Sequence, residues 1–173
     1  MVENSDLRAF RRALGQFATG VGVVTAHTER GDPIGLTISS FNAVSLNPPL
    51  ILFSVARDAL SLQPLRDAAG FAVNILGYEQ RSLSDRFAKS KADKWSSVEF
   101  TRGHHDAPLL SGALAHFECS PYAEHDGGDH LIFVARVVRY SSWVGQPLIF
   151  FRGAYSSVAD KLSAPPWPLP IHY

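Results

Sequence analysis

The sequence has few of the features that mark secreted, membrane-spanning or nucleic-acid-binding proteins. Its 173 residues include a single cysteine, Cys119, so no intrachain disulfide framework can form. No apolar run approaches the roughly 20 residues that a helix needs to span a bilayer. Sixteen Lys and Arg balance sixteen Asp and Glu, which leaves no overall field to attract a polyanion. The polar, acidic start does not fit a signal peptide, so we expect a cytoplasmic protein with no nucleic-acid or membrane partner.

Motifs of several common catalytic sites are also absent. Neither Gly-x-x-x-x-Gly-Lys-Ser/Thr nor Gly-x-Gly-x-x-Gly occurs, so the chain has no P-loop and no Rossmann fingerprint. There is no Gly-x-Ser-x-Gly elbow for a serine nucleophile. His125 and His130 stand near acidic residues, but their spacing does not fit a zinc motif and no cysteine pair accompanies them. We therefore expect no metal site.

Short apolar runs predict a mainly β protein with a few helices. Leu7, Phe10, Leu14 and Phe17 recur at helical spacing and predict a surface helix packed on a core. Two further helices are expected near residues 64–70 and 79–89. Residues 42–49 and 89–106 lack periodicity and are expected to be loops. Strands are predicted at residues 21–25, 34–39, 50–55, 71–76, 113–120, 130–140 and 148–151.

About seven strands with few helices favour a closed barrel. The length suits one domain, residues 1–157, followed by a proline-rich C-terminal tail, residues 158–173. The tail contains Pro165-Pro166 and Pro168, which exclude a helix, and we expect it to run extended along the surface.

A cluster of hydroxyls occupies the end of one predicted strand. Thr37, Ser39 and Ser40 can donate to a phosphate or to the rim of a polar ring, helped by backbone N–H groups freed where the strand ends. Serine and threonine are also ordinary residues at strand ends. Judged from the cluster alone, both interpretations stay open.

A second unusual segment is Asp126-Gly127-Gly128-Asp129-His130, directly before a long apolar strand. Its glycines let the backbone approach a ligand closely, with the imidazole of His130 at the start of the strand. The same residues also fit a tight turn between two strands that merely exposes His130. The segment alone does not decide between a ligand contact and a plain hairpin.

The order and spacing of several short motifs resemble the short-chain flavin reductases, the small reductase components of two-component flavin-dependent monooxygenases. The resemblance covers about residues 7–157. The motifs are Thr19-Gly20-Val21, Gly35-Leu36-Thr37-Ile38-Ser39-Ser40-Phe41, Val44-Ser45-Leu46-Asn47-Pro48-Pro49, Phe71-Ala72-Val73-Asn74-Ile75-Leu76, Gly128-Asp129-His130 and Phe151-Arg152-Gly153-x-Tyr155.

The resemblance implies a Greek-key split β-barrel of the FMN-binding type, and an enzyme that passes a hydride from NADH or NADPH to FMN or FAD. Reduced flavin would diffuse to a separate monooxygenase, and the reductase would be a homodimer. No catalytic acid or base is implied, because the flavin and the nicotinamide carry the chemistry. The implied cofactor-binding residues are Thr37, Ile38, Ser39, Ser40 and Phe41 along the flavin, Ser54, Val55 and Ala56 from the next strand, Arg57 and Ser61 toward the phosphate, Phe87 across a helix, His130 at the nicotinamide, and Tyr155 at the barrel end or flavin edge.

Two alternatives share this barrel. One is a non-catalytic flavin or haem carrier, since one fold supports several activities. The other is an enzyme that oxidises an organic substrate with a tightly held flavin. The Gly-Asp-His motif favours the reductase over the carrier.

Overall fold

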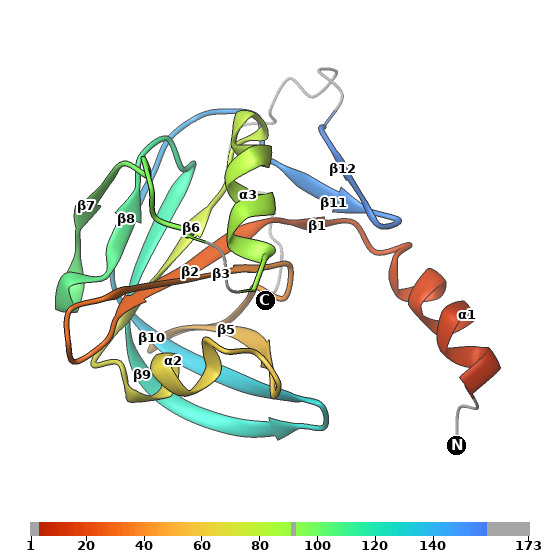
Figure 1. Ribbon diagram of the computed structural model, residues 1–173, viewed down its shortest axis with the longest axis horizontal. Coiled ribbons are helices and arrows are strands. Elements are labelled where there is room, and N and C mark those ends of the chain that lie inside the picture. The colour runs from red at the N-terminus through yellow and green to blue at the C-terminus, as the bar shows by residue number, and fades with distance from the viewer. Residues whose placement is uncertain (1–3, 91–92, 159–173) are drawn as a thin grey trace.

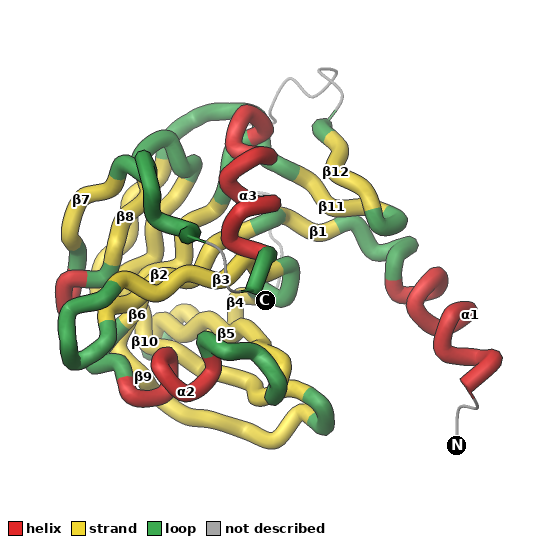
Figure 2. Tube along the Cα trace, in the orientation of Figure 1, coloured by secondary structure: helices red, strands yellow, loops and turns green. Residues whose placement is uncertain are grey.

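The computed structural model describes residues 4–90 and 93–158, and within them the chain is mainly β with a few helices (Figures 1 and 2). The proline-rich tail, apart from Val158, lies outside the described residues, so its predicted extended course stays a prediction.

A seven-stranded sheet forms the barrel. Every neighbouring pair in it is antiparallel. The pair formed by β9 (Ala115–Gly127) and β10 (His130–Ser142) is the longest and extends as a hairpin beyond the body of the barrel (Figure 1). In spatial order the strands are β3 (Pro33–Ile38), β2 (Gly22–His27), β6 (Phe71–Ile75), β9 (Ala115–Gly127), β10 (His130–Ser142), β5 (Pro49–Ala56) and β4 (Asn42–Leu46).

Two small sheets and three α-helices complete the described part of the chain. Helix α2 (Leu62–Asp67) and its C-cap residue place Leu65 and Ala68 in the barrel interior, and α3 (Arg81–Ala88) packs across β3 and β2. The remaining elements are β1 (Thr19–Gly20) with β11 (Ile149–Phe151) and β12 (Ala154–Ser156), β7 (Phe100–Arg102) with β8 (Pro108–Leu110), the helices α1 (Asn4–Leu14), α2 (Leu62–Asp67) and α3 (Arg81–Ala88), and the 3-10 turns η1 (Tyr78–Gln80) and η2 (His104–Asp106).

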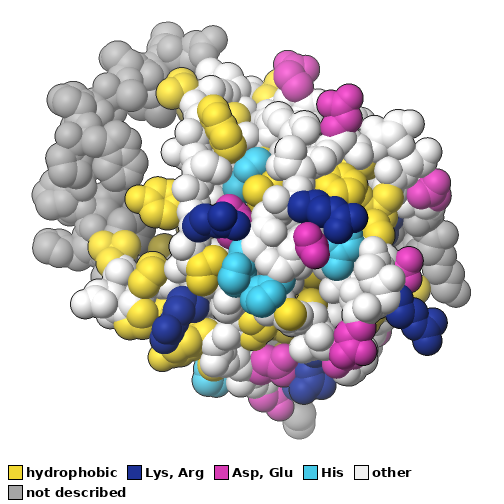
Figure 3. Space-filling model, turned by 90° about the vertical axis from the view of Figure 1, so that its left-hand side faces the viewer, with side chains coloured by type: hydrophobic (Ala, Val, Ile, Leu, Met, Phe, Trp, Pro, Cys, Tyr) yellow, Lys and Arg dark blue, Asp and Glu magenta, His cyan; other side chains and the backbone are white. Residues whose placement is uncertain are grey.

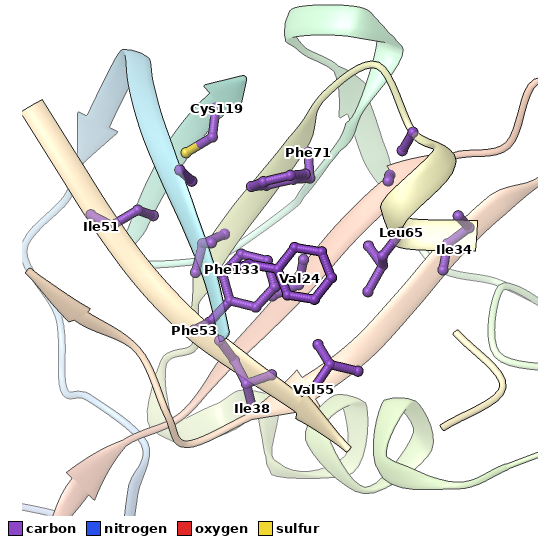
Figure 4. Packing of buried hydrophobic residues seen from close by; sticks show 14 of the residues in the cluster. Val24, Ile34, Ile38, Ile51, Phe53, Val55, Leu65, Phe71, Cys119 and Phe133 are labelled. Atoms are coloured by element: carbon purple, nitrogen blue, oxygen red, sulfur yellow. The ribbon is translucent and has the colours of Figure 1, made fainter. Parts of the chain in front are cut away.

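Aromatic packing fills the barrel interior. The rings of Phe53 and Phe133 stack with centroids 5.1 Å apart, and Phe71 meets Phe53 edge to face at 5.3 Å (Figure 4). Such contacts add to the gain from burying large apolar rings. On the other side of β2, Val23 belongs to a second cluster with Phe87, Leu110 and Leu148. Strand β2 is thus covered on both faces, which explains why its residues from Gly22 to Ala26 are all buried.

A serine side chain joins the end of β3 to β5. The Ser40 hydroxyl accepts the backbone N–H of Ser54 at 2.9 Å and donates to the Ser54 carbonyl at 3.2 Å. These are the hydrogen bonds that a neighbouring strand would otherwise supply. The barrel is therefore closed here by a side chain rather than by a continuous backbone ladder.

The N-terminal helix differs from the prediction that it packs on a core. Helix α1 ends at Leu14, and Leu7, Phe10 and Leu14 are 40%, 50% and 58% exposed. In Figure 1 the helix projects from the body of the molecule. It is attached at its C-terminal end, where Arg152 donates to the Gly15 carbonyl and to the Gln16 side chain. The apolar periodicity shows which face of the helix is suited to burial, but not whether the same chain or another one buries it.

Several boundaries also differ from the predicted ones. Residues 42–49 contain an edge strand, β4, and residues 89–106 contain β7 and η2, so both predictions of a plain loop were wrong. Strand β4 is mostly exposed and lacks the alternation that marks a half-buried strand. Helix α2 begins at Leu62 rather than at Pro64, which the first turn tolerates because its N–H groups need no helical partner. Strand β12 was not predicted.

The face of the molecule drawn in Figure 3 shows no dominant charge. On the face drawn in Figure 3, basic, acidic and histidine side chains are intermixed with apolar ones. No helix in the described residues is long and apolar enough to cross a bilayer.

Candidate functional site

A cavity of about 510 Å³ opens where the end of β3 meets β5 and the start of β10. Its size falls in the range of small-molecule sites. Apolar side chains alternate with hydroxyls along its wall. It is lined by Leu36, Thr37, Ile38, Ser39, Ser40, Ser54, Val55, Ala56, Ala59, Gly127, His130 and Ile132.

The register between β5 and β10 explains why these side chains meet. His130 pairs with Ala56, and Ile132 pairs with Ser54. The intervening Leu131 and Phe133 point into the barrel core, so by strand alternation His130 and Ile132 share the opposite face with their partners. The cavity thus lies on the outer face of these two strands.

The hydroxyls of the predicted cluster have different partners. Thr37 donates to the Ser84 carbonyl of α3 at 2.7 Å, and Ser40 is bonded to the backbone of Ser54. The hydroxyls of Ser39 and Ser54 have no hydrogen-bond partner within the described ranges, and both residues line the cavity. These two hydroxyls are the ones free to bind a ligand.

The β9–β10 turn holds His130 at the cavity rim. Gly128 adopts φ +75°, and its N–H donates to the Asp126 carboxylate at 2.9 Å. That hydrogen bond, followed by the Arg57 guanidinium, lowers the pKa of Asp126. The Nδ1 atom of His130 lies 2.7 Å from the Asp129 carboxylate, a hydrogen bond that lowers the pKa of Asp129. The turn and the imidazole are both positioned by neighbouring carboxylates.

A second cavity of about 330 Å³ adjoins the first and shares Leu36 and Ala59 with it. Ser61, predicted to lie toward a phosphate, is part of its wall. Ala88 at the end of α3 lines it as well. Through these shared residues the two cavities form one groove.

Four predicted site residues line neither cavity. Phe41 stacks on Phe117 with centroids 5.3 Å apart, and Phe87 is fully buried against Trp95. Tyr155 shares a 2.8 Å hydrogen bond with Ser84, and burial raises its pKa. Arg57 points to the β9–β10 turn. The other nine, Thr37, Ile38, Ser39, Ser40, Ser54, Val55, Ala56, Ser61 and His130, line the two adjoining cavities.

Sequence reasoning missed part of the lining. Ala59 and Ile132 line the larger cavity, and Leu36 joins it to the smaller one, whereas Gly127, which also lines the larger cavity, belongs to the glycine turn that the sequence singled out. Apolar lining residues carry no chemical signature, but the alternation of β10 would have indicated Ile132 once His130 was chosen. Within the described residues, no three His, Cys, Asp or Glu side chains are arranged to hold a metal ion.

Comparison with known proteins identifies the family. Residues 14–159 match the flavin reductase like domain. The chain is 40% identical to the reductase subunit HsaB of a flavin-dependent monooxygenase of Rhodococcus jostii, across 95% of this chain and 85% of the relative. It is 43% identical to the FMN reductase (NADH) SmoA of Agrobacterium fabrum, across 88% and 86%.

A solved structure agrees with the sequence relatives. The Streptomyces globisporus NADH:FAD oxidoreductase SgcE6, in complex with NAD and FAD fragments, superimposes with a TM-score of 0.86 at 36% identity, covering 93% of this chain and 98% of that one. The chain belongs to the flavin reductase like domain family. The predicted fold, a mainly β split barrel, and the predicted enzyme class, a flavin reductase, are confirmed.

Proposed function

We propose that this flavin reductase binds its flavin in the groove between β3, β5 and β10, and that His130 meets the nicotinamide substrate at the groove's rim. The observation that carries this placement is the larger cavity, where the free hydroxyls of Ser39 and Ser54 lie among apolar side chains. That composition fits a planar ring with polar edges. His130 reaches the same cavity from the opposite strand, so both reactants are brought to one opening.

The flavin, when bound, supplies the redox chemistry by accepting a hydride from the nicotinamide. The protein's residues have only to bind and orient the two rings, because proximity and alignment supply much of the rate of such a transfer. Leu36, Ile38 and Ile132 provide apolar surface, and Ser39 and Ser54 provide hydrogen bonds. Asp129 fixes the ring of His130 through the Nδ1 contact, which leaves Nε2 for a substrate group.

Steady-state oxidation of NADH, with and without added flavin, tests the function. We expect turnover that requires added FMN or FAD and a purified protein that loses its flavin readily. A carrier on the same barrel would bind flavin but show no flavin-dependent turnover. Protein that stays yellow and does not exchange its flavin would instead indicate an enzyme that oxidises an organic substrate with a tightly held cofactor.

The choice of flavin and of pyridine nucleotide is a separate question. One relative is named an FMN reductase (NADH) and another an NADH:FAD oxidoreductase, so the family includes both flavins. NADH is the nucleotide in both names, and we propose it for this chain. The four combinations of FMN or FAD with NADH or NADPH, assayed side by side, decide the preference.

The reduced flavin serves a separate monooxygenase in this proposal. A relative at 40% identity is the reductase subunit of such a monooxygenase. The cavity is open to solvent rather than enclosed, which suits release of the product. Cys119 is a buried free thiol, as is usual in a reducing compartment, and we place the reaction in the cytoplasm.

We also propose a homodimer. The exposed Leu7, Phe10 and Leu14 of α1, together with Phe17, form an apolar face of the kind that a second subunit covers. Trp95 packs on Phe87 and Phe100 of its own chain and is not part of this face. Light scattering after gel filtration should give twice the chain mass for the wild type and the chain mass for Phe10→Glu. A monomeric wild type would contradict the proposal.

A further inference from the structure

The turn that carries His130 has little packing to hold it in place. It joins β9 to β10 at the end of their long hairpin (Figure 1). A Cβ built on Gly128 would meet no atom within 4 Å among the described residues. The side chains of Asp126 and Asp129 are 81% and 93% exposed. Polar contacts, rather than packing, therefore fix the position of this turn.

Arg57, the first residue after β5, makes three contacts with the turn. Its Nε donates to the Gly128 carbonyl at 2.8 Å, and an Nη lies 3.0 Å from the Asp126 carboxylate. Its backbone N–H donates to the Asp129 carbonyl at 2.9 Å. The guanidinium can hold a carbonyl and a carboxylate at once because its donors are fixed in a planar fork. The resemblance implied a contact of Arg57 with the phosphate, whereas here the fork is directed to the turn.

The carboxylate of Asp126 holds the same turn from the β9 side. It accepts the Gly128 N–H at 2.9 Å as well as the Arg57 guanidinium. Both backbone polar groups of Gly128 are thus bonded to charged side chains, which hold this residue at φ +75°. We call the pair of Arg57 and Asp126 the turn brace.

The turn brace connects two sides of the larger cavity. Ala56, which precedes Arg57, lines that cavity and pairs with His130 across β5 and β10. Gly127, on the other side of the turn, lines it as well. A shift of the turn would therefore move the imidazole relative to the cavity.

We propose that Arg57 is a positioning residue for the reaction: through the turn brace it holds His130 where the nicotinamide substrate enters, and it binds neither substrate itself. This rests on the proposed function, which places the nicotinamide at His130. A contact made equally in the bound substrate and in the transition state affects KM and not kcat. Because Arg57 and Asp126 are exposed, their ion pair contributes little to folding, and variants of either should fold.

The test is the steady-state oxidation of NADH at saturating FMN, with the dissociation constant of FMN measured separately by quenching of flavin fluorescence. Arg57→Gln should raise the KM for NADH about two- to fivefold, the range of an exposed ion pair, and leave kcat and FMN affinity within about twofold. Arg57→Lys keeps the charge but not the fork and should recover only part of the change. An unchanged KM in Arg57→Gln would overturn the proposal.

The double variant Arg57→Gln, His130→Ala decides whether Arg57 acts through the imidazole. Without the imidazole the turn brace has nothing to position, so Arg57→Gln should add little to the KM of His130→Ala. For the same reason the effect of Arg57→Gln alone should not exceed that of His130→Ala. Additive effects of the two substitutions would overturn the proposal.

Asp126→Ala tests the turn brace from its other side. It removes the acceptor of both the guanidinium and the Gly128 N–H, so it should raise the KM for NADH as Arg57→Gln does. If Arg57 instead bound the diphosphate of NADH directly, Asp126→Ala would free the guanidinium and lower the KM. A lower KM would therefore contradict the positioning role.

A second arginine–carboxylate pair that reaches the same hairpin provides the matched control. Arg66 of α2 lies 3.0 Å from Glu124 of β9, its side chain is 46% exposed against 47% for Arg57, and neither member of the pair lines the groove. Arg66→Gln should leave both the KM for NADH and the FMN affinity unchanged. An equal rise of KM in Arg66→Gln and Arg57→Gln would indicate a general effect of charge and refute the positioning role.

The same measurements separate a failure of this proposal from a failure of the proposed function. A wild type that oxidises no NADH with added flavin would contradict the function, and this proposal with it. If His130→Ala raises the KM for NADH and Arg57→Gln does not, the function stands and the role of Arg57 is wrong. A loss of FMN affinity in Arg57→Gln that spares riboflavin would place Arg57 at the flavin phosphate and also overturn the proposal.

Discussion

Replacing Ser40 with alanine should weaken the closure of the barrel at the proposed flavin site. The Ser40 hydroxyl makes both hydrogen bonds between the end of β3 and the backbone of Ser54, at 2.9 and 3.2 Å. Alanine leaves the N–H and C=O of Ser54 without these partners. Because each hydrogen bond contributes roughly 0.5–1.5 kcal/mol net, their loss costs about 1–3 kcal/mol.

The open groove reduces that cost. Ser54 is only half-buried and lines a cavity that water can enter, so its backbone groups recover part of their hydrogen bonding from solvent. We therefore expect the free energy of unfolding to fall by about 1–2 kcal/mol. For a chain of this length, that corresponds to a fall in Tm of about 2–8 °C.

Urea unfolding of the flavin-free protein provides the measurement, with Ser39→Ala as the matched control. Ser39 is the exposed neighbour, and its hydroxyl has no partner in the described residues, so its loss should change stability by less than about 0.5 kcal/mol. Flavin affinity should nevertheless fall in Ser39→Ala, because this hydroxyl faces the cavity. Equal unfolding midpoints for Ser40→Ala and the wild type would refute the closure argument.

Three further outcomes follow from the same geometry. His130→Ala should raise the KM for NADH about two- to tenfold with little change in flavin affinity, and unchanged steady-state kinetics would remove His130 from the site. Burial raises the pKa of Cys119 to about 12, so the thiol of the folded protein should resist thiol reagents at pH 8. The stability of the protein should fall as the pH rises from about 9 toward 12, because in that range the thiol ionises only in the unfolded state. Fast labelling of Cys119 in the folded state would contradict this. Gly35→Ala places a Cβ 2.2 Å from the buried ring of Phe87 and should lower the free energy of unfolding, measured by thermal unfolding, by about 3 kcal/mol. The control Gly20→Ala, whose Cβ would have nothing within 4 Å, should leave the stability nearly unchanged. A Gly35→Ala variant as stable as the wild type would show that the ring can move.

The strands that could be predicted are those whose burial leaves a pattern in the sequence. Strand β2 is covered on both faces and reads as an apolar run, and β5 and β10 alternate because one face points into the barrel. Strand β4 is exposed at the sheet edge, and β7 and β8 are three residues each. Their partners are close in the chain, β5 for β4 and β8 for β7, but strands this exposed or this short carry too little of an apolar pattern to be recognised.

The candidate site, like the strands, could be predicted from the sequence only in part. The Gly-Gly turn and the hydroxyls of Ser39 and Ser40 can be located in the sequence because they stand at the ends of predicted strands. The sequence does not show which hydrogen-bond partner each of these side chains has. Only the structure shows that Ser40 is committed to the barrel and that Arg57 is committed to the turn.

The two interpretations of the hydroxyl cluster, ordinary strand-end residues and ligand contacts, therefore both apply, but to different residues. Thr37 and Ser40 hold α3 and β5 to the end of β3, and that packing keeps Ser39 and Ser54 facing an open cavity. Since the first pair fixes the geometry in which the second pair can bind, substitutions should separate into two classes: loss of stability at Thr37 and Ser40, and loss of flavin affinity without loss of stability at Ser39 and at the Ser54 hydroxyl. A flavin reductase that must release its product benefits from this arrangement, because a few neutral hydrogen bonds in an open groove hold the cofactor in place without trapping it.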